Sequence, residues 1–483
     1  MKSFLIFFLI IIFFISCEKQ KNINFVSIKD GHFRLHDAPF YPVALNYGVW
    51  MEANQKELWA CPDFCYSDDP NSAYLPKDSC ILKLKAEMEL IREMGFNTVR
   101  IVGIGEEEVE DKKTGELSVR ARVGFHRDTT IMLFGKTSYT KYCEALAGLF
   151  KVINEAGLKA ILLIRSSPET QTTEEHFKKL GAYFKNDSTI LAYDFFNEPL
   201  YFDSIERTKE DVAAISRHWK KMARKYAPNQ LLTIGLEGIR EVFKWDPNIL
   251  DVDFLSLHPY EYEPEQVRNE IYWYGKYISV PWILGETGLA ADDSVVSYNE
   301  QRMFAKKTVK QVVNCGGVGY SWWQYMDIDL AEFQKNYLGV LSRSGETKTL
   351  NGYIVKGAVK PVVNEFKSFR PEPVKDSCIC LSNYYNYSQH KKFRLKGYLM
   401  DENNKPIEGG VILGWNQWWS SSFHTVSKQD GSFELLGSFP FYHWMASATR
   451  YSMVRAEILP DTAKVIQDKI PTVNLGRLKV QKL

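Results

Sequence analysis

The stretch LKLKAEMELIREMGFNTVRIVG, residues 82–103, indicates the fold of the first domain. Its apolar residues first recur at helical spacing, then Gly95 stands where a helix C-cap belongs, and an apolar strand follows. The segment ALAGLFKVINEAGLKAILLIRS, residues 145–166, repeats the pattern, with Gly157 in the corresponding place. Helix, glycine and strand in repetition predict an α/β fold with parallel strands.

Eight strand candidates follow one another along the chain, and helix-like segments separate most of them. They cover residues 41–46, 97–102, 159–164, 190–196, 231–236, 252–258, 282–286 and 317–323. Eight alternating units over about 350 residues predict a (β/α)₈ TIM barrel with extended loops. A doubly wound open sheet is the alternative, but it usually carries a Gly-rich dinucleotide fingerprint near its start, and the sequence has none.

The character of the sequence changes after the barrel. RPEPVKD, residues 370–376, is a charged connector rich in proline, and short strands with turns follow it. This pattern predicts a small all-β sandwich of about 100 residues. We place the barrel at residues 25–370, a linker at 371–391 and the sandwich at 392–483.

The sandwich segment also shows a spaced set of turn residues. They are Gly397, Asp401, Pro406-Ile407, Gly409-Gly410 and Asp430-Gly431-Ser432-Phe433. Over residues 392–455 this spacing resembles the carboxypeptidase-regulatory-like domain. Trp415, Trp418 and Trp419 of this segment either stack on sugars or pack within the protein, and we favour packing.

The amino terminus has the form of a secretion signal. An apolar run from Phe4 to Ile15 follows an early lysine, and Ser16-Cys17 comes next. The run is short for a membrane span, so an uncleaved anchor is the less favoured alternative. The segment looks like a bacterial lipoprotein signal peptide, residues 1–17. That resemblance implies that Cys17 is lipidated and anchors the protein to a membrane of the bacterial cell envelope. The expected location is the outer membrane, with the protein facing either the periplasm or the cell surface.

Charge and cysteine content indicate which binding partners and cofactors to expect. A net charge of +1 gives no indication of a surface that binds nucleic acid. We also expect the protein to be a monomer. Cys61, Cys65 and Cys80 lie in one loop-like segment without a nearby histidine, so a disulfide there is favoured over a metal site. The sequence contains no catalytic metal motif, and no cofactor is expected.

Polar residues end several of the predicted strands, and in a barrel the carboxyl ends of all strands meet on one face. In YDFFNEPL, residues 193–200, Pro199 cannot continue a central strand, which leaves Glu198 at the strand end. Glu286 ends strand 7 in WILGETG. The other residues expected on this face are Asn46, Arg100, Asn197, His258, Tyr260, Trp322 and Trp323.

This set of side chains fits the cleavage of a glycosidic bond. One carboxyl group must protonate the leaving oxygen while a second attacks or stabilises the anomeric carbon. The two groups must differ in protonation at one pH, which their environments can arrange. Aromatic faces can hold the apolar faces of sugar rings.

Asn197-Glu198-Pro199 at the end of strand 4, together with Glu286 at the end of strand 7, resembles clan A of the glycoside hydrolases. MGFNTVRI, YDFFNEP, HPY and LGETG resemble family 5 in particular, over about residues 30–370. The resemblance implies a retaining double displacement on a β-linked polysaccharide or oligosaccharide. β-1,4-Mannan and β-glucan are the leading substrates.

The resemblance also implies a role for each residue. Glu198 would be the general acid/base and Glu286 the nucleophile. Asn197 would bind the sugar 2-hydroxyl. The remaining expectations are that Arg100 and Tyr260 hold Glu286 ionised, that His258 lines the first subsite, and that Trp323 or Trp322 lies under the ring that is cleaved.

One departure from family 5 concerns strand 3. Members often carry a histidine near its end, where this chain reads ILLIRSS with Arg165 and Ser166. Neither residue can be given the histidine's role, and this leaves the subfamily and the substrate open.

Other interpretations compete with the enzyme. A single glutamate is most often a solvated loop residue, Arg100 could form an ordinary salt bridge, and His258 could be a core histidine. A non-catalytic glycan-binding lipoprotein on the same barrel is the main alternative, but it has no use for two carboxylates. A phosphate-binding barrel ranks last, because Gly316-Gly317 lies at the start of strand 8.

Overall fold

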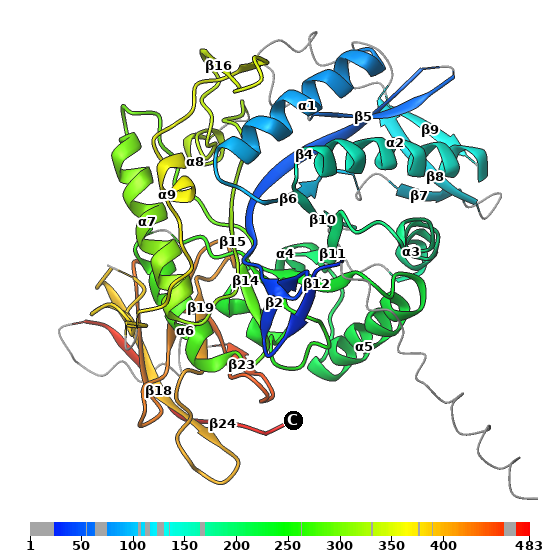
Figure 1. The fold of residues 1–483 in the computed structure, drawn as a ribbon. Helices are drawn as coiled ribbons and strands as arrows, with labels where there is room; N and C mark the ends of the chain where they lie inside the picture. Colours follow the sequence, from blue (N-terminus) through cyan, green and yellow to red (C-terminus); the bar gives the residue numbers. More distant parts are fainter. Residues whose placement is uncertain are drawn as a thin grey trace, which may run out of the picture.

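Eight parallel strands close into a barrel at the centre of the molecule (Figure 1). The computed structural model describes residues 24–483 except 55, 63–74, 105–107, 112–115, 123–129, 135, 165–169, 262, 330–331, 375–376, 389 and 458–469. Each barrel strand pairs with the next, and β15 pairs with β4 to close the ring. The strands are β4 Val43–Ala53, β6 Thr98–Val102, β10 Lys159–Leu163, β11 Ile190–Asn197, β12 Leu231–Leu236, β13 Leu255–Leu257, β14 Trp282–Leu284 and β15 Tyr320–Trp322. The prediction of a TIM barrel is confirmed.

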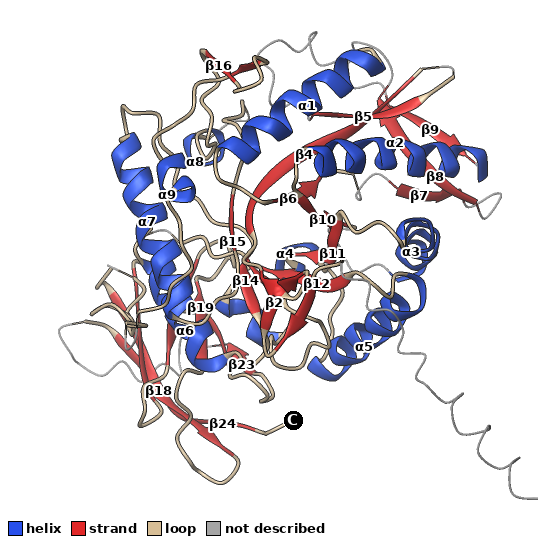
Figure 2. Cartoon of the chain, in the orientation of Figure 1, coloured by secondary structure: helices blue, strands red, loops and turns tan. Residues whose placement is uncertain are grey.

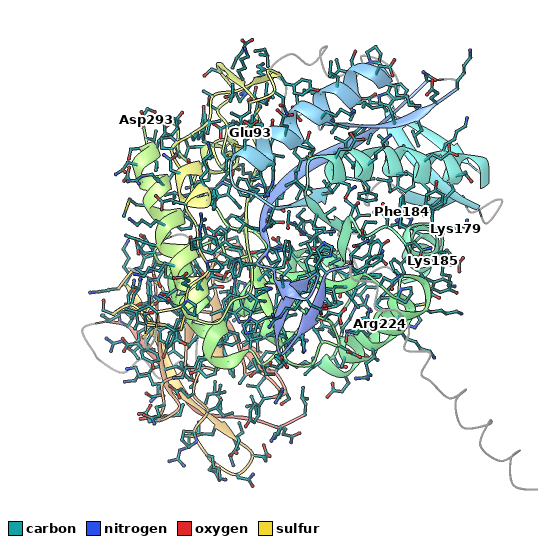
Figure 3. All side chains as sticks on the ribbon, in the orientation of Figure 1. Glu93, Lys179, Phe184, Lys185, Arg224 and Asp293 are labelled. Atoms are coloured by element: carbon teal, nitrogen blue, oxygen red, sulfur yellow. A yellow bond between two sulfur atoms is a disulfide. The ribbon has the colours of Figure 1, made fainter. Side chains whose placement is uncertain are left out.

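Helices surround the strands on the outside (Figure 2). The long ones are α1 Lys77–Glu93, α2 Lys136–Glu155, α3 Thr170–Phe184, α5 Lys209–Tyr226, α6 Gln266–Tyr277 and α7 Tyr298–Asn314. Shorter segments are α4 Pro199–Phe202, η4 Ile239–Phe243, α8 Phe333–Asn336 and α9 Val363–Lys367. Charged side chains such as Lys179 on α3 and Arg224 on α5 lie on the outer face of this layer (Figure 3).

Gly95 and Gly157 end their helices as the sequence pattern predicts. Gly95 has φ +97° and Gly157 has φ +73°, a left-handed conformation that favours glycine. The N–H of Phe96 donates to the carbonyl of Ile91 at 3.3 Å, and the N–H of Gly95 donates to that of Arg92 at 3.1 Å. These two bonds form a Schellman motif, which satisfies the last carbonyls of α1. The turn then delivers the chain directly into β6.

A small antiparallel sheet covers the amino-terminal end of the barrel. Phe33 of this sheet packs edge-on against Phe254, with ring centroids 5.1 Å apart. Both rings belong to an apolar cluster that includes Ile161, Leu191 and Ile283. The opposite, carboxyl end of the barrel is the end at which such folds place their active sites. The covering strands are β1 Ser27–Lys29, β2 His32–Leu35 and β3 Ala38–Pro39.

Additional strands extend the carboxyl end of the barrel. β4 continues beyond the predicted end of strand 1 at Asn46 and reaches Ala53, where it pairs with β5 in an antiparallel hairpin. β8 joins this extension through one parallel pairing and also pairs with β7 and β9. The extending strands are β5 Leu58–Pro62, β7 Glu108–Asp111, β8 Glu116–Arg122 and β9 Thr130–Phe134. A separate hairpin joins β16 Glu346–Lys348 and β17 Ile354–Lys356.

The carboxyl-terminal segment forms two sheets around its own apolar core. One sheet has the order β21-β18-β24 and the other β20-β19-β22-β23, and all pairs except β18–β24 are antiparallel. Trp415 is partly buried and packs against the main apolar core, as expected. Trp418 is 77% exposed and Trp419 is 54% exposed, so the expectation of packing is wrong for these two. The strands are β18 Phe393–Asp401, β19 Val411–Trp415, β20 Ser422–Val426, β21 Ser432–Gly437, β22 His443–Ser447, β23 Val454–Glu457 and β24 Thr472–Val480.

Buried polar contacts join this sandwich to the barrel. The ammonium group of Lys209 lies 3.0 Å from Oδ2 of Asp246, and it also donates to the Ser447 hydroxyl at 3.0 Å. Trp273 Nε1 donates to the carbonyl of Gly409 at 2.8 Å. A buried charge that is paired and hydrogen-bonded is costly to separate. The two parts are therefore packed as one body around α5 and α6.

The described residues contain a disulfide outside the segment for which the sequence predicts one. Cys315 at the end of α7 forms a disulfide with Cys378 in the linker, across 63 residues of sequence. The sulfurs of Cys61 and Cys80 are 3.0 Å apart, but no disulfide joins them. Cys65 lies outside the described residues, so its part of the prediction stays untested.

Cys17 and the rest of the amino-terminal signal also lie outside the described residues. Among the helices that the structure describes, none combines the length and apolar character needed to cross a membrane.

Candidate active site

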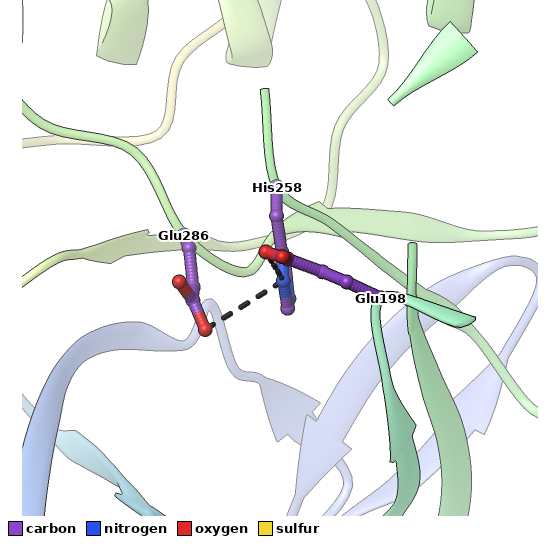
Figure 4. Close-up of side chains that lie close together, drawn as sticks. All are labelled: Glu198, His258 and Glu286. Atoms are coloured by element: carbon purple, nitrogen blue, oxygen red, sulfur yellow. Dashed lines mark hydrogen bonds and ion pairs between the residues drawn. The ribbon is translucent and has the colours of Figure 1, made fainter. Parts of the chain in front are cut away.

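Glu198, His258 and Glu286 meet at the carboxyl end of the barrel, and we call them the strand-end cluster (Figure 4). Glu198 follows β11 directly, His258 follows β13 directly, and Glu286 lies two residues after β14. One oxygen of each carboxylate and one nitrogen of the imidazole all lie within 4.8 Å of one another. Three neighbouring regions of the barrel thus present their side chains to one point.

The backbone turns sharply at Glu198. Its φ of 46° and ψ of 63° lie in the left-handed region, where it caps α4 at its amino terminus. Its N–H still donates to the carbonyl of Gly235 on β12 at 2.8 Å, whereas Pro199 has no N–H to offer. A non-glycine residue in this conformation costs about 1–3 kcal/mol, which the surrounding packing must offset.

His258 lies between the two carboxylates. Its Nδ1 is 3.1 Å from Oε1 of Glu198 and 3.6 Å from Oε1 of Glu286. Nε2 is 3.1 Å from the hydroxyl of Ser256, which can donate to it and so leave the ring proton on Nδ1. Burial lowers the pKa of His258 to about 4, although the charge of Glu286 acts in the opposite direction. The imidazole is therefore neutral at neutral pH and can donate to Glu198.

Two glycines make room for this imidazole. A Cβ at Gly285 would lie 1.7 Å from the Ser256 hydroxyl and 2.8 Å from Nε2 of His258. A Cβ at Gly235 would lie 2.6 Å from Cε1 of the same ring. Any side chain at either position would push His258 out of place.

Arg100 holds four side chains of the site at once. Its Nε donates to Asp194 at 2.9 Å, and its Nη2 donates to Asn197 at 2.7 Å. Its Nη1 donates to Asn46 at 3.0 Å and also to Oε1 of Glu286. A guanidinium group offers its donors in a rigid fork, so these contacts fix the orientation of the Glu286 carboxylate. Arg100 is fully buried and acts through its neighbours rather than by touching a ligand.

The two carboxylates have different electrostatic surroundings. Burial raises the pKa of Glu198 to about 7, although the charges of Arg100 and Arg240 lower it. Burial also raises the pKa of Glu286, but His258 and Arg100 oppose this rise, and Arg100 bonds to the carboxylate directly. The ion pair thus favours the charged form of Glu286, whereas Glu198 can hold a proton near neutral pH.

The two predicted asparagines differ in whether their side chains have a hydrogen-bonding group available to a ligand. Asn46 accepts from Arg100, and its Nδ2 donates to the Gly285 carbonyl at 3.1 Å and to the Ser321 hydroxyl at 3.0 Å. Its hydrogen bonds are used within the protein, which contradicts the expectation that it binds substrate. Asn197 accepts from Arg100, while its amide nitrogen has no hydrogen-bond partner among the described residues. That nitrogen is available to a ligand.

The two predicted tryptophans also differ. Trp322 is fully buried, its Nε1 donates to the Leu338 carbonyl at 2.8 Å, and its ring packs against Phe304 and Phe366. The expectation that Trp322 offers a face to a sugar is therefore wrong, because its side chain points outward to the helices. Trp323 is partly exposed and stays the candidate platform.

Tyr260 is 36% exposed and makes no hydrogen bond to Glu286 within the described part of the chain. Arg100 makes the hydrogen bond that orients this carboxylate, and the role of Tyr260 stays a prediction. Arg165 and Ser166, at the end of strand 3, lie outside the described residues.

Several residues of the site were not expected from the sequence. Asp194 is a buried partner of Arg100, and Ser256 is the partner of His258. Both could have been noticed as polar residues inside apolar strand segments. At the end of β12, the Tyr201 hydroxyl donates to Glu237 at 3.0 Å and accepts from Arg240 at 3.0 Å. No predicted site residue lies at that strand end.

Comparison with known proteins identifies the family. The family model for cellulase, glycosyl hydrolase family 5, matches residues 71–327, which is more than half of the chain. The protein belongs to glycoside hydrolase family 5. No match was found among curated protein sequences.

The fold is similar to that of several solved structures. One is an exo-beta-1,4-mannosidase from Opitutaceae bacterium strain TAV5, at 17% identity and a TM-score of 0.49; the match covers 71% of this chain and 61% of that one, less than two thirds of its length. Another is GH5_18 from Streptomyces cattleya in complex with Manb1-4GlcNAc, at 16% identity and a TM-score of 0.45, covering 67% of this chain and 80% of that one. A third is the endo-1,4-beta-mannanase from Rhizomucor miehei, at 13% identity and a TM-score of 0.43, covering 62% and 90%.

Proposed function

We propose that the protein is a retaining hydrolase of β-linked glycans, with Glu286 as nucleophile and Glu198 as general acid/base. The observation that carries the proposal is the spacing of the two carboxylates, whose nearest oxygens lie within 4.8 Å of each other. Retaining pairs stand about 5–5.5 Å apart, whereas inverting pairs stand about 6.5–9.5 Å apart to admit a water molecule.

The reaction follows from the two environments. The ionised Glu286, held by Arg100, attacks the anomeric carbon and forms a glycosyl ester as the glycosidic bond breaks. Glu198 donates its proton to the leaving oxygen. In the second step Glu198 takes a proton from water, and that water displaces Glu286 and restores both groups. A pKa of about 7 at Glu198 suits both the acid and the base role near neutral pH.

Two further side chains support the binding of sugar. The amide nitrogen of Asn197 is placed beside Glu198 and can donate to the 2-hydroxyl of the ring that is cleaved. Trp323 presents a partly exposed ring for the apolar face of that sugar. Membership of family 5 makes β-1,4-mannan or β-glucan the proposed substrate.

The test is hydrolysis of a panel of β-mannans, β-glucans and xylan by the mature protein and by Glu286→Gln. We expect the wild type to cleave one glycan class and the variant to be inactive. If both proteins bind a glycan equally and neither cleaves any, the protein is a glycan-binding lipoprotein rather than an enzyme.

We also propose that Cys17 is lipidated and tethers the enzyme to the cell envelope, on the motif Ser16-Cys17 after a short apolar run. The measurement is membrane fractionation of wild type and Cys17→Ala. We expect the variant to move to the soluble fraction. Full retention of Cys17→Ala in the membrane would refute lipidation as the anchor.

A further inference from the structure

A second group of two glutamates and a histidine lies between the barrel and the sandwich. Glu261 follows β13 in the loop that also carries Tyr260, Glu270 lies on α6, and His424 lies on β20. One ligand atom of each lies within 4.8 Å of the others. We call these three residues the interface cluster.

The interface cluster is largely buried. His424 is 6% exposed and Glu270 is 2% exposed. The side chain of Glu261 is 11% exposed. Nε2 of His424 lies 3.5 Å from Oε1 of Glu261 and 3.9 Å from Oε1 of Glu270. Two carboxylates and an imidazole nitrogen therefore converge in a buried space.

The hydrogen bonds of the cluster leave two of its three converging atoms unsatisfied among the described residues. Oε2 of Glu270 accepts from the Tyr274 hydroxyl and from the N–H of Ile239, which turns Oε1 towards His424. Within the described part of the chain, neither Nε2 of His424 nor Oε1 of Glu261 has a hydrogen-bond partner. A buried polar atom without a partner costs about 1–3 kcal/mol. Both unsatisfied atoms point to the same place.

The distances match those between the ligands of one small metal ion. Tetrahedral zinc binds nitrogen and carboxylate oxygen at about 2.0–2.2 Å, which separates neighbouring ligand atoms by roughly 3.3–3.6 Å. The separations of 3.5 Å and 3.9 Å from His424 Nε2 lie close to this value. Imidazole and carboxylate together suit zinc better than calcium or magnesium, which prefer oxygen alone.

We propose that Glu261, Glu270 and His424 bind one divalent metal ion of the zinc class. The ion satisfies all three converging atoms and neutralises the two carboxylates. A water molecule or a second carboxylate oxygen completes its coordination. The site joins β20 of the sandwich to the loop that begins with His258, so the metal fastens the second domain to a wall of the active site.

A proton shared by the two carboxyl groups is the alternative way to relieve their repulsion. Burial and the adjacent Glu270 raise the pKa of Glu261 well above its usual range, and burial lowers the pKa of His424 well below its own. One shared proton would satisfy the carboxyl pair, but it would leave the imidazole nitrogen with only Oε1 of Glu261 at 3.5 Å, which is long for a hydrogen bond. A metal ion accounts for all three groups.

The experiment measures binding of Zn²⁺ to the full mature chain after treatment with a chelator. We expect about one equivalent of Zn²⁺ per chain and an unfolding temperature that rises with Zn²⁺. His424→Ala should weaken the binding of Zn²⁺ by at least roughly 100-fold. His218→Ala is the matched control, because the His218 side chain is 49% exposed and pairs with Glu174 away from the interface cluster. This variant should bind Zn²⁺ as the wild type does.

Equal Zn²⁺ affinity in wild type and His424→Ala would overturn the proposal, as would a wild type that binds no Zn²⁺. If His424→Ala does not fold, the wild type loaded with Co²⁺ decides. A visible absorption spectrum of tetrahedral Co²⁺ supports the site, and its absence refutes it. None of these results depends on glycan hydrolysis, so they leave the proposed catalytic function to its own test.

Discussion

The strand-end cluster and the interface cluster contain the same residue types, two glutamates and one histidine within 4.8 Å. Their surroundings differ. In the strand-end cluster Arg100 bonds to one carboxylate and a serine hydroxyl satisfies the imidazole. In the interface cluster an imidazole nitrogen and a carboxylate oxygen lack partners among the described residues.

Access to solvent differs as well. The Glu198 side chain is 16% exposed beside the partly exposed Tyr260, whereas the side chains of Glu261, His424 and Glu270 are 11%, 7% and 3% exposed between two domains. A catalytic pair needs an open side for its substrate and different proton affinities at its two carboxyl groups. A structural metal site needs closure and free lone pairs. The hydrogen-bond partners of the side chains and their exposure to solvent, rather than the residue types, therefore distinguish the proposed catalytic site from the proposed metal site.

The largest effect is expected from Glu286→Gln. The amide cannot form the glycosyl ester, so kcat/KM on the cleaved glycan should fall by about 10⁴-fold or more. Steady-state kinetics beside the control Glu332→Gln, an exposed residue 62% accessible at its side chain, measures the loss. Retention of more than a tenth of wild-type activity would show that this carboxylate is not the nucleophile.

Glu198→Gln should reduce kcat/KM by about 10²–10⁴-fold, because proton transfer to the leaving group is lost. In the wild type, the raised pKa of about 7 means that the acid form disappears as pH rises through 7. Activity should therefore fall on the alkaline side, and this fall should be absent from the residual activity of Glu198→Gln. An unchanged alkaline limb in the variant would assign that pKa to another group.

Arg100→Met tests the partner that distinguishes the strand-end cluster. The change leaves Asp194 and Glu286 as buried charges without their cation, which should lower the free energy of unfolding by about 3–5 kcal/mol. Denaturant titration measures it, and Arg100→Lys should retain part of the stability because it keeps the charge but not the fork. An undiminished unfolding free energy in Arg100→Met would mean that the ion pairs contribute nothing.

Trp323→Ala tests the open side of the strand-end cluster. Loss of one stacking face should raise KM by about 2–10-fold with a smaller change in kcat. Trp322→Phe is the comparison, because that ring is fully buried and should affect unfolding rather than KM. Equal effects of the two variants on KM would remove the distinction between them.

The smallest effect on catalysis is expected from Glu270→Gln in the interface cluster. It should lower kcat/KM by less than about tenfold, which is under about 1.4 kcal/mol of barrier. It should also abolish the dependence of the unfolding temperature on Zn²⁺. A loss of activity as large as that of Glu198→Gln would show that the two clusters act as one unit.

The sequence predicts the barrel well because its information is local. Helical periodicity, the C-cap glycines and apolar strands repeat along the chain. Glu198 stands directly after β11, and Glu286 stands two residues after β14. The choice between Trp322 and Trp323 could not be made, because a shift of one residue reverses the face of a strand. The structure buries Trp322 and leaves Trp323 partly exposed, so Trp323 stays the predicted platform.

Contacts between distant segments could not be predicted. The disulfide joins Cys315 to Cys378 across 63 residues, and the interface cluster depends on how the sandwich docks. Neither leaves a local pattern in a single sequence. Asn46 is a similar case. The sequence predicts that it lies on a strand, but only the structure shows that its side-chain amide is hydrogen-bonded within the protein.

The most direct test of the central claim is the stereochemistry of the first product. Once the glycan panel has identified a substrate, proton NMR can follow the anomeric signal during the first minutes of hydrolysis. Double displacement through Glu286 predicts that the β-anomer appears first and then mutarotates. Initial appearance of the α-anomer would contradict a retaining pair formed by Glu198 and Glu286.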